Sequence, residues 1–375
     1  MLKVEHWVEE HRYMGYEPFD GLSSALRPLT FGNLFLDRLM LQLVRQSPLN
    51  LRHLFGIRPL ESTKGRGYMA SGYLTMYLTT RDSSYRERAE TCLEWLMKNK
   101  SPKFKEFAWA NHFDFASRTG SYSKDDPIIV WTALIGQAFL DAYEILGNMK
   151  YLDVASSVCE WIMALPREQT DDGVCISYMA STQSSIHNSN MLGAAMLART
   201  SKFKANMRYR ELAKEAMDYS CSKQTPNGAW FYGEAENQRW IDNFHTGYNV
   251  DSLKCYIEST GDRSFEQNLE KGFRYFLDTF IEKSGRPKYY HNRAYPIDIQ
   301  CASQAITTLA YFSDYHKDSL EMAKKVATWT IRNMQDPSGY FYYRVYPCIK
   351  AKTPMLHWGQ ATMYKGLTLM LSRLN

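Results

Sequence analysis

The chain has 375 residues, of which 45% are hydrophobic and 14% aromatic, and its net charge of +5 is spread along the sequence. Lys and Arg form neither a long run nor a basic tail, which argues against a nucleic-acid groove. Seven cysteines are widely scattered and never form a C-x-x-C pair, so we expect reduced thiols in the cytoplasm and neither a disulfide framework nor a zinc site.

The N-terminal stretch MLKVEHWVEEHRYMGYEPFDG contains no apolar run long enough for a signal peptide. No uninterrupted apolar run elsewhere reaches the ~18 residues that a membrane span needs. The sequence therefore predicts a cytoplasmic protein without a membrane span.

A small residue followed by a polar or aromatic one recurs near the start of apolar helical runs. The gaps between successive small residues are 64, 57, 54, 56 and 56 residues, for Gly72, Gly136, Gly193, Gly247, Ser303 and Gly359. Such a period indicates a stack or ring of equivalent units. Each period holds a helix that is apolar nearly all round, expected inside, and then an amphipathic helix, expected outside.

Four of the expected inner helices are preceded by a glycine and an aromatic strip, which predicts short extended segments that carry aromatic side chains to one end of the molecule. These glycines are Gly173, Gly228, Gly285 and Gly339. The last inner helix, residues 355–371, lacks an outer partner, and we expect residues 31–44 to supply it, so that segment 1–60 closes the ring. The predicted fold is an all-α, single-domain (α/α)6 toroid over residues 1–375; an open α-solenoid is the alternative, but its last repeat would need a polar cap.

This layout resembles the six-hairpin carbohydrate-active superfamily, which includes glycoside hydrolases, N-acylglucosamine 2-epimerase-like isomerases, polyuronate lyases and the helical domain of uronyl C5-epimerases. The Gly-Gln-Ala triplets, the Tyr-Pro pairs at 295–296 and 346–347, and the early histidine of the closing helix, His357, look like features of the C5-epimerase domain. Asn243 and His245, with Tyr and Arg in the next loop, are similar to the neutraliser and acid/base sets of toroid lyases. The resemblance implies an enzyme that acts on a glycan.

The stretch WIDNFHTGY, residues 240–248, holds the first candidate catalytic residues. Asp242 and Asp298 both lie five residues before their marker residue, so they are either helix N-caps or a carboxylate pair of the kind a glycosidase uses. His245 and His357 also share one repeat position, two residues before the marker. Imidazole titrates near neutrality, which suits proton abstraction and donation.

The loop at 289–298 is the densest polar and aromatic run in the chain. Arg293 suits a carboxylate clamp, and Tyr290 or Tyr295 suits a proton donor; the alternative is a packing loop with a surface arginine. Further residues are expected to contact a sugar from the helix heads and the aromatic strips, although capping and packing are the competing interpretations. They are Asn243, Tyr248, His187, Asn188, Trp109, His112, Trp230, Tyr232, His291 and Tyr342.

Abstraction of the proton beside a uronate carboxylate needs a charge neutraliser, a base and a proton donor. Arg293 with Asn243, one of the two histidines, and one of the loop tyrosines supply these roles. We therefore expect epimerisation or β-elimination on a uronic-acid-containing oligo- or polysaccharide. A hydrolase that uses the aspartate pair and a non-catalytic glycan-binding or scaffold protein are the alternatives. No cofactor motif is present, and the expected chemistry needs no metal, although His245, His357 and Asp298 have side chains that can bind one.

Overall fold

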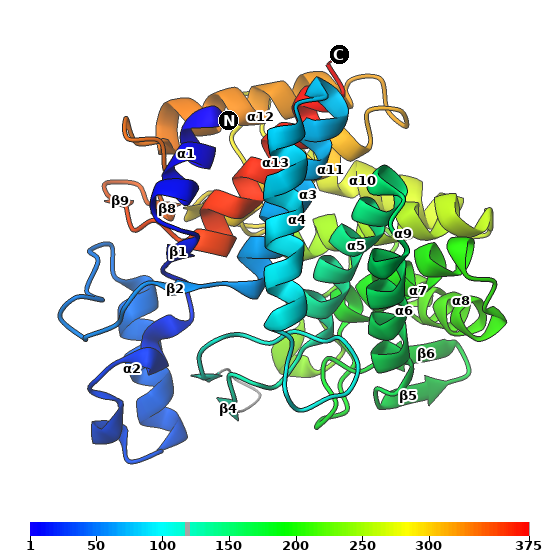
Figure 1. Cartoon of the computed structure of the whole chain (residues 1–375), viewed down its shortest axis with the longest axis horizontal. Coiled ribbons are helices and arrows are strands. Elements are labelled where there is room, and N and C mark those ends of the chain that lie inside the picture. The colour runs from blue at the N-terminus through cyan, green and yellow to red at the C-terminus, as the bar shows by residue number, and fades with distance from the viewer. Residues whose placement is uncertain (117–120, 375) are drawn as a thin grey trace.

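The computed structural model describes residues 1–116 and 121–374, and Figure 1 shows that it is built mainly of helices. Their contacts define an inner and an outer layer. The inner layer consists of α3 (Thr63–Thr80), α5 (Ile129–Leu146), α7 (His187–Phe203), α9 (Asn243–Thr260), α11 (Ile299–Tyr311) and a last helix that begins as the π-helix η4 (Leu356–Ala361) and continues as α13 (Thr362–Ser372). Each inner helix packs against the next, and α13 packs against α3. The inner layer is therefore a closed ring and not an open solenoid, which confirms the predicted all-α toroid.

The outer layer contains the amphipathic helices α4 (Ser83–Lys98), α6 (Met149–Met163), α8 (Met207–Ser222), α10 (Glu266–Phe280) and α12 (Ser319–Met334). They bury one apolar stripe against the inner helices, as in α10, where Leu269, Phe273 and Phe276 recur at helical spacing and are buried. The inner helices are buried on almost all sides because they contact neighbours in both layers.

The sixth outer position is taken by α1 (Leu2–Glu10), which contacts η4 and α13. The four strip glycines show why. Each has a positive φ, and a Cβ built there would lie 2.3 to 2.4 Å from a carbonyl oxygen of the next outer helix: Glu215, Lys271, Lys325 and, for Gly339, Lys3 of α1. Only glycine allows this close approach in the left-handed region. Lys3 thus occupies the same place as its three counterparts on α8, α10 and α12.

The expectation that residues 31–44 form the sixth outer helix is wrong in detail. Those residues contribute to α2 (Leu34–Gln46), which packs against the 3-10 helices Asp20–Ser23 and Arg27–Thr30 and against β3 (Phe115–Ala116). In Figure 1 α2 projects at the lower left, away from the outer layer. The apolar pattern of residues 31–44 indicated a helix but not which surface it covers.

The strands are short and lie in the loops. Two-stranded antiparallel pairs are formed by β1 (Met14–Gly15) with β2 (Leu60–Glu61), β3 with β4 (Ser121–Tyr122), and β5 (Arg167–Thr170) with β6 (Gly173–Ile176); β7 (Ile297–Asp298), β8 (Arg344–Val345) and β9 (Lys350–Ala351) form a three-stranded sheet. Helix α5 is long and apolar enough to cross a membrane by length and composition, but here it is an inner helix packed against α3, α6 and α7.

Candidate active site

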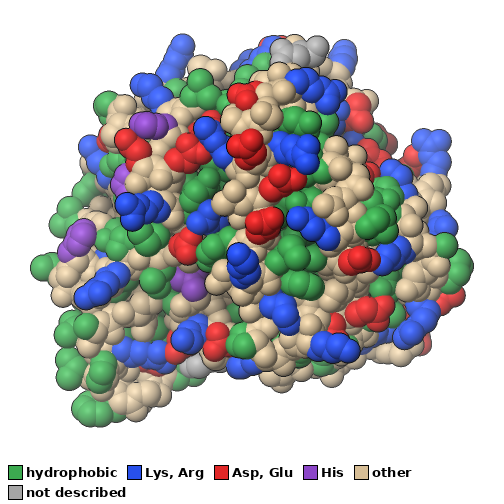
Figure 2. Space-filling model, viewed as in Figure 1, with side chains coloured by type: hydrophobic (Ala, Val, Ile, Leu, Met, Phe, Trp, Pro, Cys, Tyr) green, Lys and Arg blue, Asp and Glu red, His purple; other side chains and the backbone are tan. Residues whose placement is uncertain are grey.

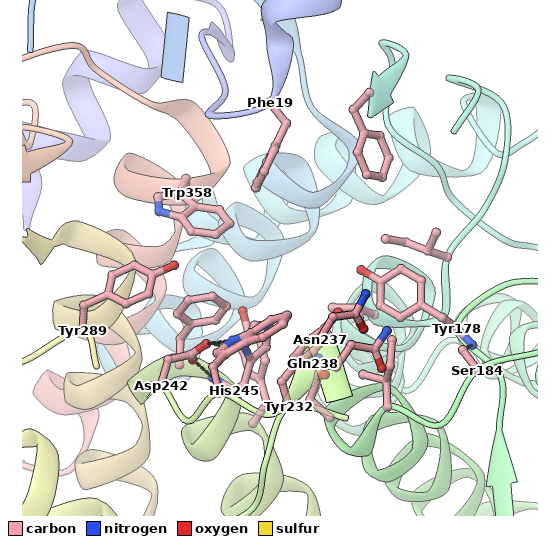
Figure 3. Close-up of a pocket in the computed structure, with 18 of the residues that line it drawn as sticks. Phe19, Tyr178, Ser184, Tyr232, Asn237, Gln238, Asp242, His245, Tyr289 and Trp358 are labelled. Atoms are coloured by element: carbon pink, nitrogen blue, oxygen red, sulfur yellow. Dashed lines mark hydrogen bonds and ion pairs between the residues drawn. The ribbon is translucent and has the colours of Figure 1, made fainter. Parts of the chain in front are cut away.

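A cavity of about 1340 Å³ lies where the inner helices begin, and Figure 3 shows part of its wall. Its lining comes from the heads of α3, α5, α7, α9 and η4, from the loops that precede them, and from one side of α2. Pockets for drug-sized ligands are usually about 300 to 1,000 Å³, so this cavity has room for an oligosaccharide.

His245 and Asp242 form the first polar pair in the wall. The carboxylate of Asp242 caps α9 by accepting the backbone N–H of His245 through Oδ1 at 3.0 Å. Oδ2 accepts from Nδ1 of His245 at 2.7 Å and from Nε1 of Trp240 at 2.9 Å. Since a carboxylate only accepts, Nδ1 of the imidazole carries hydrogen and Nε2 is left for a substrate. Asp242 is thus both a cap and the group that orients His245.

His357 and Glu17 form the second pair, and both are buried. Nδ1 of His357 lies 2.5 Å from Oε2 of Glu17, and the His357 backbone N–H donates to Oε1 at 2.9 Å. Burial alone would raise the pKa of Glu17, but the contacts with His357 outweigh burial and hold that pKa below its usual value. Burial lowers the pKa of His357, although Glu17 opposes this shift. At neutral pH the pair is therefore a carboxylate beside a neutral imidazole with an unprotonated Nε2.

Lys64 brings a positive charge to the same wall. It lies at the head of α3, and its Nζ is 5.4 to 5.7 Å from the ring centroids of Tyr68, Trp131 and Tyr248. Burial lowers the pKa of Lys64 to about 7, while Glu17 acts in the opposite direction. Near neutral pH this ammonium group can therefore both stabilise an oxyanion and exchange a proton.

Aromatic rings cover much of the remaining wall. Tyr232 stacks on Trp240, with centroids 4.3 Å apart and planes at 13°, and Tyr232 also contacts the ring of His245. The ring of Phe244 contacts both His245 and Trp358, and Trp358 contacts His357 in turn. This chain of ring contacts connects the two histidines within the cavity wall. Flat apolar faces with polar edges suit the faces of a sugar ring.

Several other residues predicted from the sequence also line the cavity. Tyr248 does so, and its hydroxyl contacts Tyr68 and accepts from Gln300 Nε2 at 2.8 Å. Further members of the predicted set in the wall are Asn188, Tyr232, Tyr290, His291 and Arg293. Arg293 is exposed, and its guanidinium lies 5.7 Å from the ring centroid of Tyr290, so it stands at the rim of the cavity.

Asp298 lies outside the wall and is fully buried. It caps α11 through the Gln300 N–H, and its carboxylate accepts from Nε of Arg344 at 2.6 Å and Nε1 of Trp358 at 2.8 Å. Both oxygens are therefore engaged by protein donors. The structure does not bring Asp242 and Asp298 together as a carboxylate pair facing a substrate.

Other predicted residues also lie away from the cavity wall. Trp109 and Trp230 are buried, and their indole N–H groups donate to the carbonyls of Leu96 and Ser220, so both are core residues. Tyr342 donates to Asp336, and Tyr295 packs beside Arg286. Three polar members of the set are also absent from the wall: His112, His187 and Asn243.

Two of these polar residues nevertheless lie close to residues of the site. His187 holds Glu234, a wall residue, through Nε2 at 2.8 Å. Burial lowers the pKa of His112 to about 4, while the nearby Glu17 acts in the opposite direction. His187 therefore supports a wall residue from behind the cavity.

The sequence did not predict three residues of the site, namely Glu17, Lys64 and Glu234. None occupies the repeat position that marks His245 and His357, and Glu17 comes from the segment before the first inner helix, which has no counterpart in the other repeats. A buried carboxylate beside a histidine becomes visible only in three dimensions. Among the described residues no group of three or more His, Cys, Asp or Glu side chains is arranged to hold a metal ion.

No family model matches the chain, and no curated protein matches its sequence. Solved structures do superpose on it. A sugar epimerase from a ruminal bacterium gives a TM-score of 0.64 at 15% identity, with 85% of this chain and 90% of that chain covered. Cellobiose 2-epimerase from Bacillus thermoamylovorans gives 0.62 at 12% identity, with 82% and 87% covered. The chain shares their (α/α)6-toroid fold.

The same fold is found in a hydrolase. An inactive variant of an α-1,6-mannanase from Salegentibacter sp., with two adjacent aspartates changed to asparagine and solved in complex with α-1,6-mannotriose, gives a TM-score of 0.61 at 14% identity, with 84% of this chain and 90% of that chain covered. The fold therefore supports both sugar epimerases and glycoside hydrolases, and the site residues must distinguish them.

Proposed function

We propose that the protein is a sugar epimerase or isomerase that moves a proton at the carbon next to a carbonyl group. The observation that carries this proposal is the pair of histidines, His245 and His357, that line one cavity and each have Nδ1 within 2.7 Å of a carboxylate oxygen. Such a carboxylate fixes the tautomer and leaves Nε2 as the reacting nitrogen.

In this mechanism Nε2 of one histidine removes the proton from the carbon beside the carbonyl of an open-chain sugar. The electron pair of the C–H bond forms a carbon–carbon double bond, and the carbonyl oxygen becomes an enediolate oxyanion. Lys64 stabilises that charge in a buried setting, where electrostatic stabilisation is strong. The second histidine, as its conjugate acid, returns a proton to the opposite face of the same carbon, and the oxyanion reforms the carbonyl, which gives the epimer. Isomerisation instead places the proton on the former carbonyl carbon, while the hydroxyl proton of the carbon that lost its hydrogen moves to the oxyanion.

The acidic residues argue against hydrolysis. Glu234 and Asp242 are the acidic side chains in the described part of the wall, and Asp242 already binds His245 and Trp240. The mannanase neighbour loses activity when two adjacent aspartates are changed. In this chain neither adjacent pair, at 125–126 or at 171–172, lines the cavity. A glycosidase needs two carboxylates that flank the scissile bond.

A uronic-acid substrate is the second candidate, favoured by the charge of the wall. Six cationic side chains line the cavity against the two acidic ones: Arg38, Arg45, Lys64, Arg239, Arg293 and Arg344. A positive cavity attracts an anionic glycan. The same two histidines would then act at the carbon beside the carboxylate, where the outcome is C5 epimerisation or β-elimination, and Arg293 at the rim would bind a carboxylate of the chain.

We also infer that the protein works in a reducing compartment such as the cytoplasm. All seven cysteines are free, and five of them are buried in the core. Buried thiols of this kind behave as small apolar residues, which persist reduced in the cytosol.

The test is incubation in deuterated water with two sets of sugars, neutral reducing mono- and disaccharides and uronate oligosaccharides, followed by NMR. Deuterium at C2 with a new epimer or ketose supports the main proposal. Deuterium at C5, or a new unsaturated uronate, selects the second candidate. New reducing ends without deuterium would indicate a hydrolase, and binding without any turnover would indicate a non-catalytic glycan-binding protein; either result overturns the proposal.

A further inference from the structure

An exposed apolar surface covers residues 26–60, here called the α2 module. Eleven of the 20 exposed large hydrophobic residues among the described part of the chain fall in these 35 positions: Leu26, Leu29, Phe31, Leu34, Phe35, Leu36, Leu39, Leu43, Leu49, Leu54 and Leu60. Figure 2 shows hydrophobic side chains gathered at the lower left, where Figure 1 places α2. A patch this concentrated marks an interaction surface, because isolated exposed leucines would be spread over the molecule.

The inner side of the α2 module packs against the rest of the chain, whereas its outer side has no such partner. Met40 and Leu41 pack with Leu22 and Ala116 in a small core that is separate from the main one. Phe35 and Leu39, in contrast, point outward with 71% and 47% of their surface exposed. The helix is therefore apolar on both faces, and only one face has a partner within the described chain.

The charges of the α2 module identify the chemistry of the missing partner. Its one acidic residue, Asp37, is buried and accepts from Thr30 Oγ1 at 2.6 Å. Three of its arginines have no ion-pair partner among the described residues; Arg58 is exposed, whereas Arg38 and Arg45 are half-buried and line the cavity. Exposed leucine and phenylalanine beside uncompensated arginine is the pattern of a helix that lies in the interface of a membrane with anionic lipids.

We propose that the α2 module docks the protein on the surface of an anionic lipid bilayer. Phe35, Leu39 and their exposed neighbours enter the boundary between headgroups and acyl chains, and Arg58 binds a lipid phosphate. A second copy of the chain fits this surface less well, because the module offers no exposed carboxylate to pair with Arg58 across a two-fold interface.

Docking through the α2 module would place the cavity close to the membrane surface. Helix α2 also contributes Arg38, Gln42, Arg45 and Gln46 to the cavity wall. One helix therefore carries both the lipid-facing surface and part of the sugar-facing wall. A docked molecule would hold its cavity beside the membrane surface, where glycans that are attached to lipids are presented. The docking proposal itself does not depend on the reaction that the cavity performs.

The test is sedimentation of the full chain with vesicles of phosphatidylcholine, with and without phosphatidylserine. We expect binding to the anionic vesicles that weakens as salt is added. Phe35→Ser/Leu39→Ser should weaken the partition coefficient by about a hundredfold or more, because two large apolar side chains leave the bilayer boundary. Arg58→Gln should weaken it about fivefold, since one arginine near the surface contributes about 1 kcal/mol.

The matched control is Met149→Ser/Met207→Ser, which removes two exposed apolar side chains, 52% and 65% exposed, from α6 and α8. It should bind vesicles like the unmodified chain, and thermal unfolding should show both double variants folded. Failure of the unmodified chain to bind anionic vesicles overturns the proposal, as does equal binding by both double variants. A concentration-dependent dimer in sedimentation velocity that Phe35→Ser/Leu39→Ser abolishes, without vesicle binding, would assign the surface to a second copy instead.

Discussion

Glu17→Gln is the substitution that tests the buried pair most directly. Gln keeps the shape of Glu and an oxygen for the His357 backbone N–H, now at 2.9 Å from Oε1, but it presents an amide N–H₂ to Nδ1 in place of the carboxylate oxygen at 2.5 Å. Nδ1 must then accept, so the proton moves to Nε2 and the base is lost. The lost charge-assisted contact alone amounts to about 1.5 to 3 kcal/mol.

The expected result is a loss in kcat/KM of about 10² to 10⁴-fold, the range seen when a positioned base is lost or held in the wrong tautomer. The sign of the pH effect follows from the charges. Glu17 raises the pKa of His357 against the effect of burial, so its removal lowers that pKa further, and the acidic limb of the kcat/KM profile should move to lower pH. NMR titration of the His357 ring gives the same shift without a substrate.

The control is Glu5→Gln, which changes another buried carboxylate, paired with Arg88 on the outside of the ring. It should leave the pH profile in place. An acidic limb that stays unchanged in Glu17→Gln, or one that moves equally in both variants, would refute the assignment of His357 and Glu17 as a catalytic pair.

Further substitutions test the ring and the wall. Gly339→Ala should lower the Tm by more than Gly147→Ala, because both have positive φ but only Gly339 would place a Cβ 2.4 Å from a backbone carbonyl, while nothing lies within 4 Å at Gly147; equal losses would contradict the place given to α1. Lys64→Met should abolish turnover yet raise the Tm below pH 7, and this gain should shrink as the pH rises toward 10, because the folded chain disfavours the charged ammonium, whose pKa is about 7; a gain that is the same at all pH values would exclude the lowered pKa. Asp298→Asn should reduce the free energy of unfolding by about 3 to 5 kcal/mol in urea titrations, since it leaves a buried arginine unpaired; wild-type stability with lost activity would return Asp298 to the reacting groups. Arg293→Ala should reduce turnover of uronates by about tenfold or more and leave that of neutral sugars unchanged; a uniform loss on both would remove its role as a carboxylate clamp.

The fold was largely predictable because the ring repeats a simple physical pattern. An inner helix with neighbours on all sides must be apolar all round, and the glycines that touch the next outer helix recur at the same spacing. The helix that occupies the sixth outer position was not predictable. Both α1 and α2 have an apolar face to bury, and the choice between them depends on the long-range contact of Lys3 with Gly339.

The candidate site was only partly predictable from the sequence. Repeat position placed His245 and His357 in one cavity, because equivalent residues of a ring lie at the same depth. The carboxylate beside His245 could be predicted, since Asp242 is only three residues away in the sequence. The carboxylate beside His357 could not, because Glu17 is 340 residues away. Aromatic residues were a poor guide, because Trp109 and Trp230 fill the core as readily as they would line a wall.

The most direct measurement for the central claim is the position of deuterium in early turnover in deuterated water, for the unmodified chain and for His245→Asn and His357→Asn. If one histidine removes the proton and the other returns it, the first product carries deuterium while the recovered substrate does not. Each single variant should lose epimerisation, and one of them should retain exchange of the substrate proton. Product without deuterium, or unchanged turnover in both variants, would contradict proton transfer by this pair of histidines.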